Sequence, residues 1–133
     1  MIKHMKKDMK KVQSPREFYT SDDIRFILGR TAQQNDDIVC EAQLINDNVW
    51  WFHADQVPSC HAILFTNNDK LTTQQIKEVS YKILEYSSKL KKLKKKSKFG
   101  YIIFTKIKNI RRTHIPGLVT HGRNKVKRFQ IKL

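Results

Sequence analysis

The chain has 133 residues, of which 39% are hydrophobic and 29% are charged. This length and composition suit one globular domain with its own hydrophobic core and exclude a largely disordered chain. The 27 Lys and Arg residues outnumber the 12 Asp and Glu residues, and the formal net charge of +15 is typical of a protein that binds a polyanion. Neither a secretory signal nor an apolar run of membrane-spanning length is visible, so we expect a cytoplasmic protein.

The first elements are predicted from turn residues and alternation. Residues 1–13 hold lysines and apolar residues at helical spacing, which predicts a basic lead-in with a short helix. The domain itself is expected to occupy residues 14–133. Two apolar runs, Arg16–Thr20 and Ile24–Gly29, flank a polar turn and predict a hairpin. A short helix is predicted near Asn35–Ala42, because its first three residues are polar and suit a helix N-terminus.

The middle of the chain predicts two short strands and then the clearest helix. The strands are expected at Val49–Ala54 and Ala62–Phe65. Across Ile76–Leu93, apolar residues recur at spacings of three and four, which predicts one long amphipathic helix. Thr72 and Gln75 have the spacing of a capping box, so this helix is expected to begin directly after Thr72.

Several strands are expected to close the chain. Phe99–Thr105 is apolar on both faces, which predicts a central strand that is covered on both sides. Ile107–Arg112 is expected to be an edge strand, and Pro116-Gly117 to be a turn. The alternation in Arg128–Leu133 predicts a half-buried strand with a basic outer face. The order of elements favours an α+β domain, in which one mixed β-sheet carries one long amphipathic helix and a short helix.

Positive charge gathers in the second half of the chain. Glu85 is the last acidic residue, and residues 86–133 are basic or neutral. Clustered cations follow phosphates without reading sequence, and interleaved aromatic residues permit stacking on bases. A solubilising surface is the alternative interpretation. The candidate nucleic-acid-binding cations are Lys91, Lys92, Lys94, Lys95, Arg111, Arg112, Arg123, Lys125 and Arg128.

The segment 29–35, Gly-Arg-Thr-Ala-Gln-Gln-Asn, collects groups that suit a sugar-phosphate backbone. Its glycine permits an unusual turn at the end of a strand, and Arg30 offers a planar fork of five donors. Three amides follow near the start of the predicted helix, where free N–H groups attract anions. These amides, Gln33, Gln34 and Asn35, are either RNA contacts or internal ties of the loop.

A second candidate site surrounds the aromatic strand. Consecutive residues of a strand point to opposite faces, so one of Trp50 and Trp51 is expected to face the core and the other to face outward or against a helix. An outward Trp51 would stack on a base. Polar side chains around the following tight turn either contact RNA or brace the turn. They are His53, Asp55, Ser59 and His61.

Three stretches, 18–35, 50–64 and 108–133, together resemble the NFACT-R family, an RNA-binding domain found at the C-terminus of ribosome quality-control factors. The motifs are Gly-Arg-Thr-Ala-Gln-Gln-Asn in the first stretch, Trp-Trp-Phe-His-Ala-Asp and Pro-Ser-Cys-His in the second, and Lys-Asn-Ile-Arg-Arg with Pro-Gly in the third. They occur in order along nearly the whole chain. Three positions depart from the family pattern: Thr31 replaces an asparagine, Asn48 stands near the place of an acidic residue, and Cys60 stands between Ser and His.

The resemblance implies an α+β fold and non-enzymatic binding of structured RNA. The implied partner is tRNA or ribosomal RNA, including the large ribosomal subunit, in translation or ribosome-associated quality control. Longer members of the family carry further domains before this one. Activities placed in those domains, such as the elongation of C-terminal tails, are not carried over.

Other classes of function were weighed against RNA binding. Cys60 and His61 are adjacent, and adjacent residues of a strand point apart, which argues against a catalytic pair of these two. A His53–Cys60 pair is the alternative arrangement, and no catalytic residue is predicted. The Cys and His residues lack the usual metal-ligand spacings, and neither a metal nor a cofactor is expected. The apolar face of the lysine-rich helix continues into the core pattern, which argues against a membrane partner. DNA binding and a protein-binding adaptor role on the ribosome are the alternatives, because positive charge does not distinguish RNA from DNA.

Overall fold

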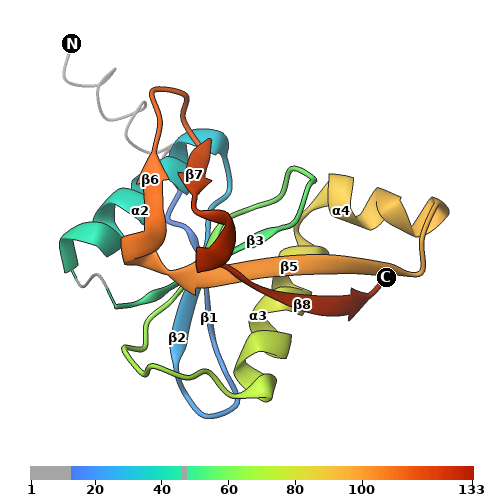
Figure 1. Cartoon of the computed structure of the whole chain (residues 1–133), viewed down its shortest axis with the longest axis horizontal. Coiled ribbons are helices and arrows are strands. Elements are labelled where there is room, and N and C mark those ends of the chain that lie inside the picture. Colours follow the sequence, from blue (N-terminus) through green and yellow to red (C-terminus); the bar gives the residue numbers. More distant parts are fainter. Residues whose placement is uncertain (1–12, 46–47) are drawn as a thin grey trace.

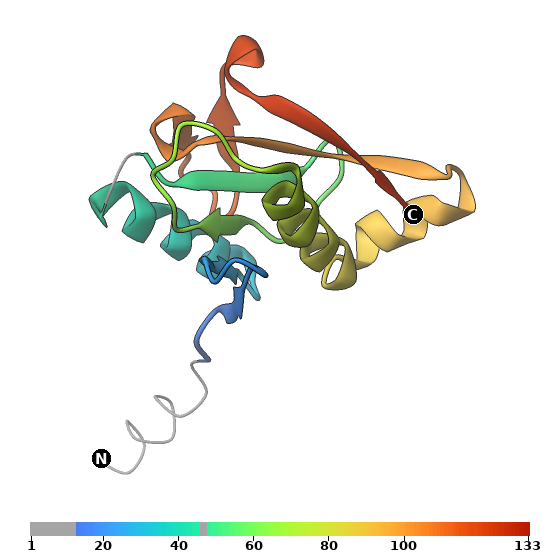
Figure 2. The same ribbon diagram turned by 90° about the horizontal axis from the view of Figure 1, so that it is seen from below.

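A six-stranded sheet in the order β1-β2-β4-β3-β5-β8 forms the centre of the computed structural model, which describes residues 13–45 and 48–133. The predicted lead-in therefore lies almost wholly outside the described residues. Every pairing between the described strands is antiparallel, so the prediction of a mixed sheet is wrong while the α+β class is confirmed. Figure 2 shows the two ends of the strand order, β1 in blue and β8 in red, on opposite sides of the molecule.

The predicted N-terminal hairpin is confirmed. Strands β1 (Arg16–Tyr19) and β2 (Arg25–Leu28) pair so that Phe18 lies opposite Phe26. Their rings are 5.5 Å apart between centroids, and this contact begins the core on one face of the sheet.

The next strands bury a tryptophan on each face of the sheet. Strands β3 (Trp50–Ala54) and β4 (Ala62–Leu64) form as predicted. Trp50 joins the core cluster beneath α3, and Trp51 joins the cluster beneath α2. Both are almost fully buried, because helices cover both faces. Trp51 therefore packs against a helix, which was the second of the two predicted alternatives, and its ring does not project outward from the sheet.

Helix α2 (Ala32–Ile45) starts earlier and runs further than the predicted short helix. It starts at Ala32 because the Thr31 hydroxyl accepts the Gln34 N–H at 3.0 Å, so Thr31 occupies the capping position. The predicted N-terminal residue, Asn35, lies inside the helix and is buried.

The predicted long helix is wrong: it is two helices and a short turn. Helix α3 (Thr73–Glu85) begins with the expected capping box between Thr72 and Gln75, whose two hydrogen bonds measure 3.0 and 2.9 Å. After a break, α4 (Ser88–Lys92) and the 3₁₀ turn η1 (Leu93–Lys95) follow. Ser87, at the break, is buried and accepts the Cys60 N–H at 3.2 Å. The apolar spacing continues through the break because both helices face the same core.

The C-terminal third supplies an interior strand, a small hairpin and an edge strand. Strand β5 (Phe99–Lys106) lies between β3 and β8 (Lys127–Lys132), which confirms the prediction of an interior strand. Residues 107–112 are not an edge strand of the main sheet. They form a 3₁₀ turn, η2 (Ile107–Asn109), and then β6 (Ile110–Arg112), which pairs with β7 (Val119–His121) in a separate hairpin.

The β6–β7 hairpin stands over the face of the sheet that α2 covers (Figure 1). The 3₁₀ turn η3 (Arg123–Lys125) links it to β8, whose alternation is as predicted, with Ile131 buried and Arg128 exposed. Within the described residues, the helices are all too short or too polar to cross a membrane.

Candidate nucleic-acid interface

Gly29 and Asn35 form a tight joint at the end of β2. The Gly29 N–H donates to the His61 carbonyl at 3.1 Å, and the Asn35 side-chain oxygen accepts the His61 N–H at 3.1 Å. A Cβ atom on Gly29 would lie 2.0 Å from that oxygen, so only glycine fits. Asn35 is therefore buried within the fold, and its bond to His61, directly before β4, favours the internal tie over an RNA contact.

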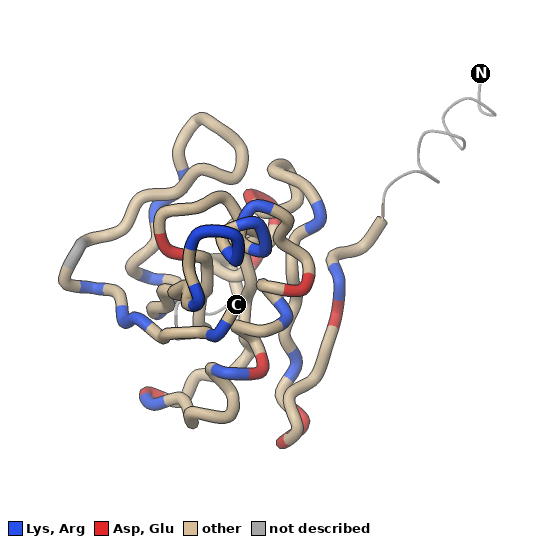
Figure 3. The backbone as a smooth tube through the Cα atoms, turned by 90° about the vertical axis from the view of Figure 1, so that its right-hand side faces the viewer, with Lys and Arg blue, Asp and Glu red and all other residues tan. Residues whose placement is uncertain are grey.

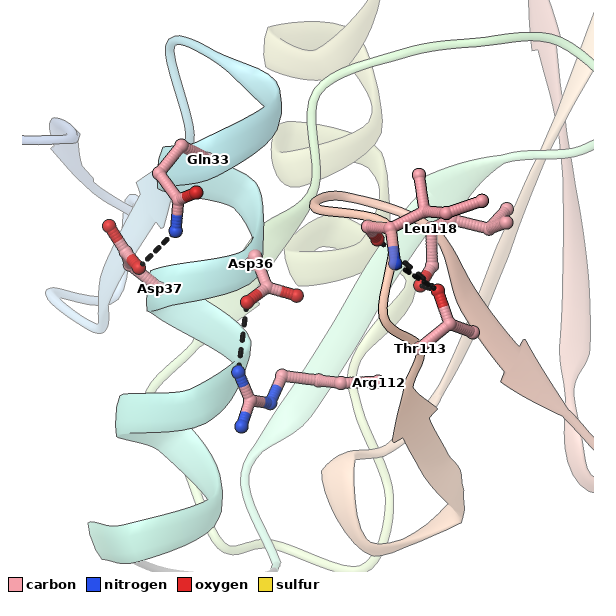
Figure 4. A network of polar contacts seen from close by, with 7 residues as sticks. Gln33, Asp36, Asp37, Arg112, Thr113 and Leu118 are labelled. Carbon is pink, nitrogen blue, oxygen red and sulfur yellow. Dashed lines mark hydrogen bonds and ion pairs between the residues drawn. The ribbon is translucent and has the colours of Figure 1, made fainter.

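The neighbouring polar side chains also tie the loop. Gln34 accepts the Arg30 N–H and donates to the Gln13 carbonyl, both at 2.7 Å, which favours the internal role for this amide. Gln33 donates to Asp37 at 3.0 Å on the exposed surface (Figure 4). Arg30 donates through Nε to the Ser14 carbonyl at 2.7 Å, which orients an exposed guanidinium.

His61 joins three elements beneath the surface. Its Nδ1 accepts the Trp51 indole N–H at 3.0 Å, and its ring also bonds the Gly117 backbone of the β6–β7 turn. Burial lowers the pKa of His61 to about 3, so the ring is neutral at physiological pH. A buried ring with both nitrogens engaged braces the fold, which favours the bracing role over a polar contact of His61 with RNA.

The β6–β7 hairpin is held against α2. Arg112 donates to the buried Asp36 carboxylate at 2.8 Å, as Figure 4 shows. Gly117 adopts a φ of +82°, and a Cβ atom there would lie 3.1 Å from the Ala32 carbonyl oxygen. The glycine thus allows both the turn and its close approach to the start of α2. One terminal nitrogen of the Arg112 guanidinium is used in this ion pair with Asp36.

The loop after β3 is braced at both ends. The Ser59 hydroxyl accepts the Ala54 N–H and donates to the Cys60 carbonyl, both at 3.0 Å, which favours bracing over RNA contact. Asp55 accepts from Arg128 Nε at 2.9 Å. The Arg128 guanidinium also lies 3.8 Å from the centre of the Tyr101 ring, so β8 and this loop are linked by charge and stacking.

These motifs surround a groove of about 670 Å³, which we call the histidine groove. Trp51 and His61 form its floor, and the His53 ring stacks parallel to Trp51 with 5.8 Å between the ring centres. The β3–β4 connection (54–59) forms one wall, and the hairpin residues 116–119 with His121 form the other. The predicted motif stretches thus meet at one place, since Ala32 and His121 line the same groove although 89 positions separate them in the sequence.

A second groove of about 310 Å³ adjoins the first, and we call it the cationic groove. Arg16, Arg30 and Lys89 line it, together with the serines at the α3–α4 break. The two grooves share four lining residues, Ala32, Asn35, Pro58 and Ser59. In Figure 1 the hairpin, the start of α2, the β3–β4 connection and α4 follow one another along the upper edge of the molecule.

The candidate cations continue this surface in two directions. Lys91, Lys92, Lys94 and Lys95 are exposed on α4 and η1 directly after Lys89, and Figure 3 shows this stretch in blue beside the C-terminus. Arg111 and Lys125 are exposed at the hairpin end, while the Arg123 side chain lies outside what the structure describes.

Sequence reasoning missed Arg16 and Lys89 as groove residues. Lys89 is the first lysine of the lysine-rich stretch, and this position could have indicated a role in binding. It lines the groove together with the serines at the break between α3 and α4. No sequence pattern marked Arg16 as a binding residue, because only folding brings β1 to the same groove as α4. Across residues 13–45 and 48–133, the structure contains no cluster of three His, Cys, Asp or Glu side chains able to hold a metal.

This fold, with its adjoining grooves and basic flanks, defines a small α+β polyanion-binding domain. The model of the NFACT protein RNA binding domain matches residues 15–128, and the chain therefore belongs to this family. Its fold is similar to that of the C-terminal part of the fibronectin/fibrinogen-binding protein from Streptococcus suis, with a TM-score of 0.74 and 19% identity. That match covers 92% of this chain and 46% of the other, so this chain spans about half of its neighbour. No curated protein matches the sequence.

Proposed function

We propose that this protein binds structured RNA without changing it chemically, and that the RNA is a tRNA or large-subunit ribosomal RNA. The role would lie in translation or ribosome-associated quality control, in the cytoplasm. The single observation that carries the proposal is the convergence of the three family motifs on two adjoining grooves with cations at both ends. A surface of this kind follows a folded backbone and also offers a recess for other parts of the RNA.

The distribution of charge supports a folded RNA partner. The cations extend from the hairpin, past the cationic groove, to α4 and η1, so they would contact phosphates on more than one segment of a compact RNA. Arg30 and Lys89, from distant parts of the sequence, line the same groove. Their side chains can therefore act on one phosphate group or on two adjacent ones.

The geometry around Cys60 supports binding rather than catalysis. Burial raises the pKa of the Cys60 thiol, which disfavours the thiolate that a nucleophile requires. The sulfur lies 3.4 Å from the Ser87 hydroxyl, and the adjacent His61 is committed to Trp51 and Gly117. His61 is thus not free to act as a general base for this thiol.

Fluorescence anisotropy with a labelled tRNA tests the proposal. Salt is varied, and unlabelled tRNA, duplex DNA and an unstructured RNA compete for the protein. We expect tRNA to bind at least about tenfold more tightly than either competitor near physiological salt. Equal binding of all three, with affinity that collapses as salt rises, would refute the proposal and favour general nucleic-acid binding, including DNA.

Matched charge reversals locate the interface. Lys89→Glu combined with Lys92→Glu changes the cationic groove and α4, whereas Lys70→Glu with Lys77→Glu makes the same change of charge on exposed positions outside both grooves. We expect the first pair to weaken tRNA binding at least about tenfold more than the second. Arg30→Ala is expected to weaken binding while the thermal unfolding midpoint stays near that of the parent. Equal losses from the two pairs would place the interface elsewhere.

A further inference from the structure

The histidine groove has the wrong chemistry for a phosphate. The described residues that line it include the Asp55 carboxylate and no Lys or Arg, and most of the rest are apolar or imidazole side chains. The Asp55 carboxylate, which is paired with Arg128, offers a phosphate no attraction there, whereas the flat face of a base gains from contact with apolar and aromatic groups. The groove volume, about 670 Å³, lies within the ~300–1,000 Å³ that is typical of pockets for small molecules.

His53 gives this groove a hydrogen-bond acceptor. Its Nδ1 lies 2.6 Å from the Ala54 carbonyl oxygen, and because that oxygen can only accept, Nδ1 must carry the proton. Burial lowers the pKa of His53, so the ring is neutral at physiological pH and Nε2 is an acceptor. Stacking on Trp51 fixes the plane of the ring. Within the described residues, no hydrogen bond occupies Nε2.

The hairpin supplies an apolar lip on the opposite wall. Leu118 is 51% exposed although it is a large apolar residue, and it lines the groove next to Gly117. An exposed leucine at the mouth of an apolar groove gains contacts when a flat ligand enters. The turn that carries it is fixed, since the Leu118 carbonyl accepts from the Thr113 hydroxyl at 2.8 Å, as Figure 4 shows.

The cationic groove lies where the phosphate of such a ligand would be. It shares four lining residues with the histidine groove, and its cations come from β1, the β2–α2 loop and α4. In a nucleotide the base and the phosphate lie on either side of the ribose. The two grooves match these two parts of a nucleotide. The histidine groove is apolar and offers hydrogen-bond acceptors, as a base requires, and the cationic groove holds three cations, as a phosphate requires.

We propose that the histidine groove binds one unstacked base of an RNA, with an adjacent phosphate of the same strand in the cationic groove. This inference rests on the proposed function and adds what the RNA must offer. A base with an amino group, as in adenine, cytosine or guanine, can donate to His53 Nε2 or to Asp55, whereas a fully paired stem has no base to insert. The partner RNA therefore carries an unpaired nucleotide at the point of contact.

The two tryptophans provide a reporter and an internal control in the unmodified protein. The Trp51 indole N–H lies at the floor of the groove, whereas the Trp50 indole N–H bonds the Asn68 carbonyl at 2.9 Å on the other face of the sheet. Nitrogen-15 NMR spectra are recorded during titration with adenosine 5′-monophosphate and, separately, with ribose 5-phosphate. We expect the nucleotide to shift the Trp51 indole signal and leave Trp50 unchanged, and the sugar phosphate to shift only residues of the cationic groove. A Trp51 signal that neither compound moves, or that both move equally, would overturn the inference.

A matched pair of leucine variants tests the same site with RNA. Leu118→Asp places a charge at the lip of the groove, and Leu44→Asp makes the same change at a position that is 82% exposed near the end of α2. The probes are two RNA hairpins that differ only in whether a one-nucleotide bulge carries adenine or is abasic. We expect the parent and Leu44→Asp to prefer the adenine probe about tenfold, and Leu118→Asp to lose that preference.

The outcomes separate this inference from the proposed function. If tRNA binds selectively but the parent protein does not distinguish the adenine bulge from the abasic one, the proposed function stands and the base-binding groove is refuted. If neither tRNA nor the hairpins bind selectively, both proposals fall. A preference for adenine that Leu118→Asp retains would place the base outside the histidine groove.

Discussion

Replacement of Gly29 by alanine tests the joint on which both grooves depend. The φ angle of Gly29 is not positive, so the backbone itself accepts alanine, and any penalty must come from the added methyl group. That methyl group would lie 2.0 Å from the Asn35 side-chain oxygen. Asn35 would have to move, and the His61 N–H would then lose its buried acceptor.

The expected loss of stability has two parts. An unpaired buried N–H costs about 1–3 kcal/mol, and an extra carbon forced into a packed site costs about 1–3 kcal/mol. Gly29→Ala should therefore lower the free energy of unfolding by roughly 2–6 kcal/mol and the thermal midpoint by roughly 10 °C or more. Asn35→Ala alone should cost about 1–3 kcal/mol, because it removes the acceptor without adding a clash.

Urea unfolding of both single variants and the double variant measures this coupling. Asn35→Ala removes the oxygen at 2.0 Å and leaves only the Asn35 Cα at 3.0 Å from the new methyl group, so the double variant should lose clearly less stability than the sum of the two single losses. Gly122→Ala is the control, since a Cβ there meets only the exposed Lys125 side chain at 3.0 Å. Additive losses, or a Gly29→Ala protein as stable as the control variant, would refute the reasoning.

Three further predictions concern stability. Thr72→Ala removes the capping box of α3 and should cost about 1 kcal/mol in urea unfolding, with tRNA affinity unchanged. Arg112→Ala leaves the buried Asp36 carboxylate without its cation, so it should lower the urea midpoint clearly more than Arg111→Ala, a neighbouring exposed arginine; equal midpoints would contradict this. Burial lowers the pKa of His61 from 6.5 to about 3, so the unfolded chain takes up this proton first as pH falls. Stability from this residue is complete above about pH 6.5 and should fall by up to about 1.4 kcal/mol per pH unit towards pH 3, which urea unfolding at several pH values together with NMR titration of the His61 ring would check.

Local patterns predicted the elements whose causes are local. The polar turn between β1 and β2 and the pairing of Thr72 with Gln75 each act over a few residues, and both appear in the structure as expected. The break before α4 was not predictable in this way. Ser87 leaves the helix to bond Cys60, 27 positions away, and the apolar spacing on either side of the break is unaltered.

The same distinction explains the site. The motifs were recognised one by one, but their meeting in space and the roles of their residues depend on partners far away in sequence. The amide of Asn35 is chemically suited to contact RNA, but it serves as an internal tie. Its partner His61 is 26 positions away in sequence and is brought beside it only by folding. The sequence left open whether the second tryptophan faces outward or against a helix. In the structure α2 covers Trp51. Arg16 reaches the cationic groove through sheet pairing, which no local pattern contains.

The position of β8 at the end of the strand order has a consequence for solubility. One side of this six-residue strand pairs with β5, and the other has no partner strand among the described residues, although its Lys132 N–H donates to the Tyr81 hydroxyl at 3.1 Å. An open edge of this length is a template for pairing with a second copy of the chain. Lys127, Arg128 and Lys132 are exposed along it, and their mutual repulsion opposes such edge-to-edge contact between molecules. Neutral residues at these positions would therefore make the protein prone to aggregate even where its folding stability is unchanged.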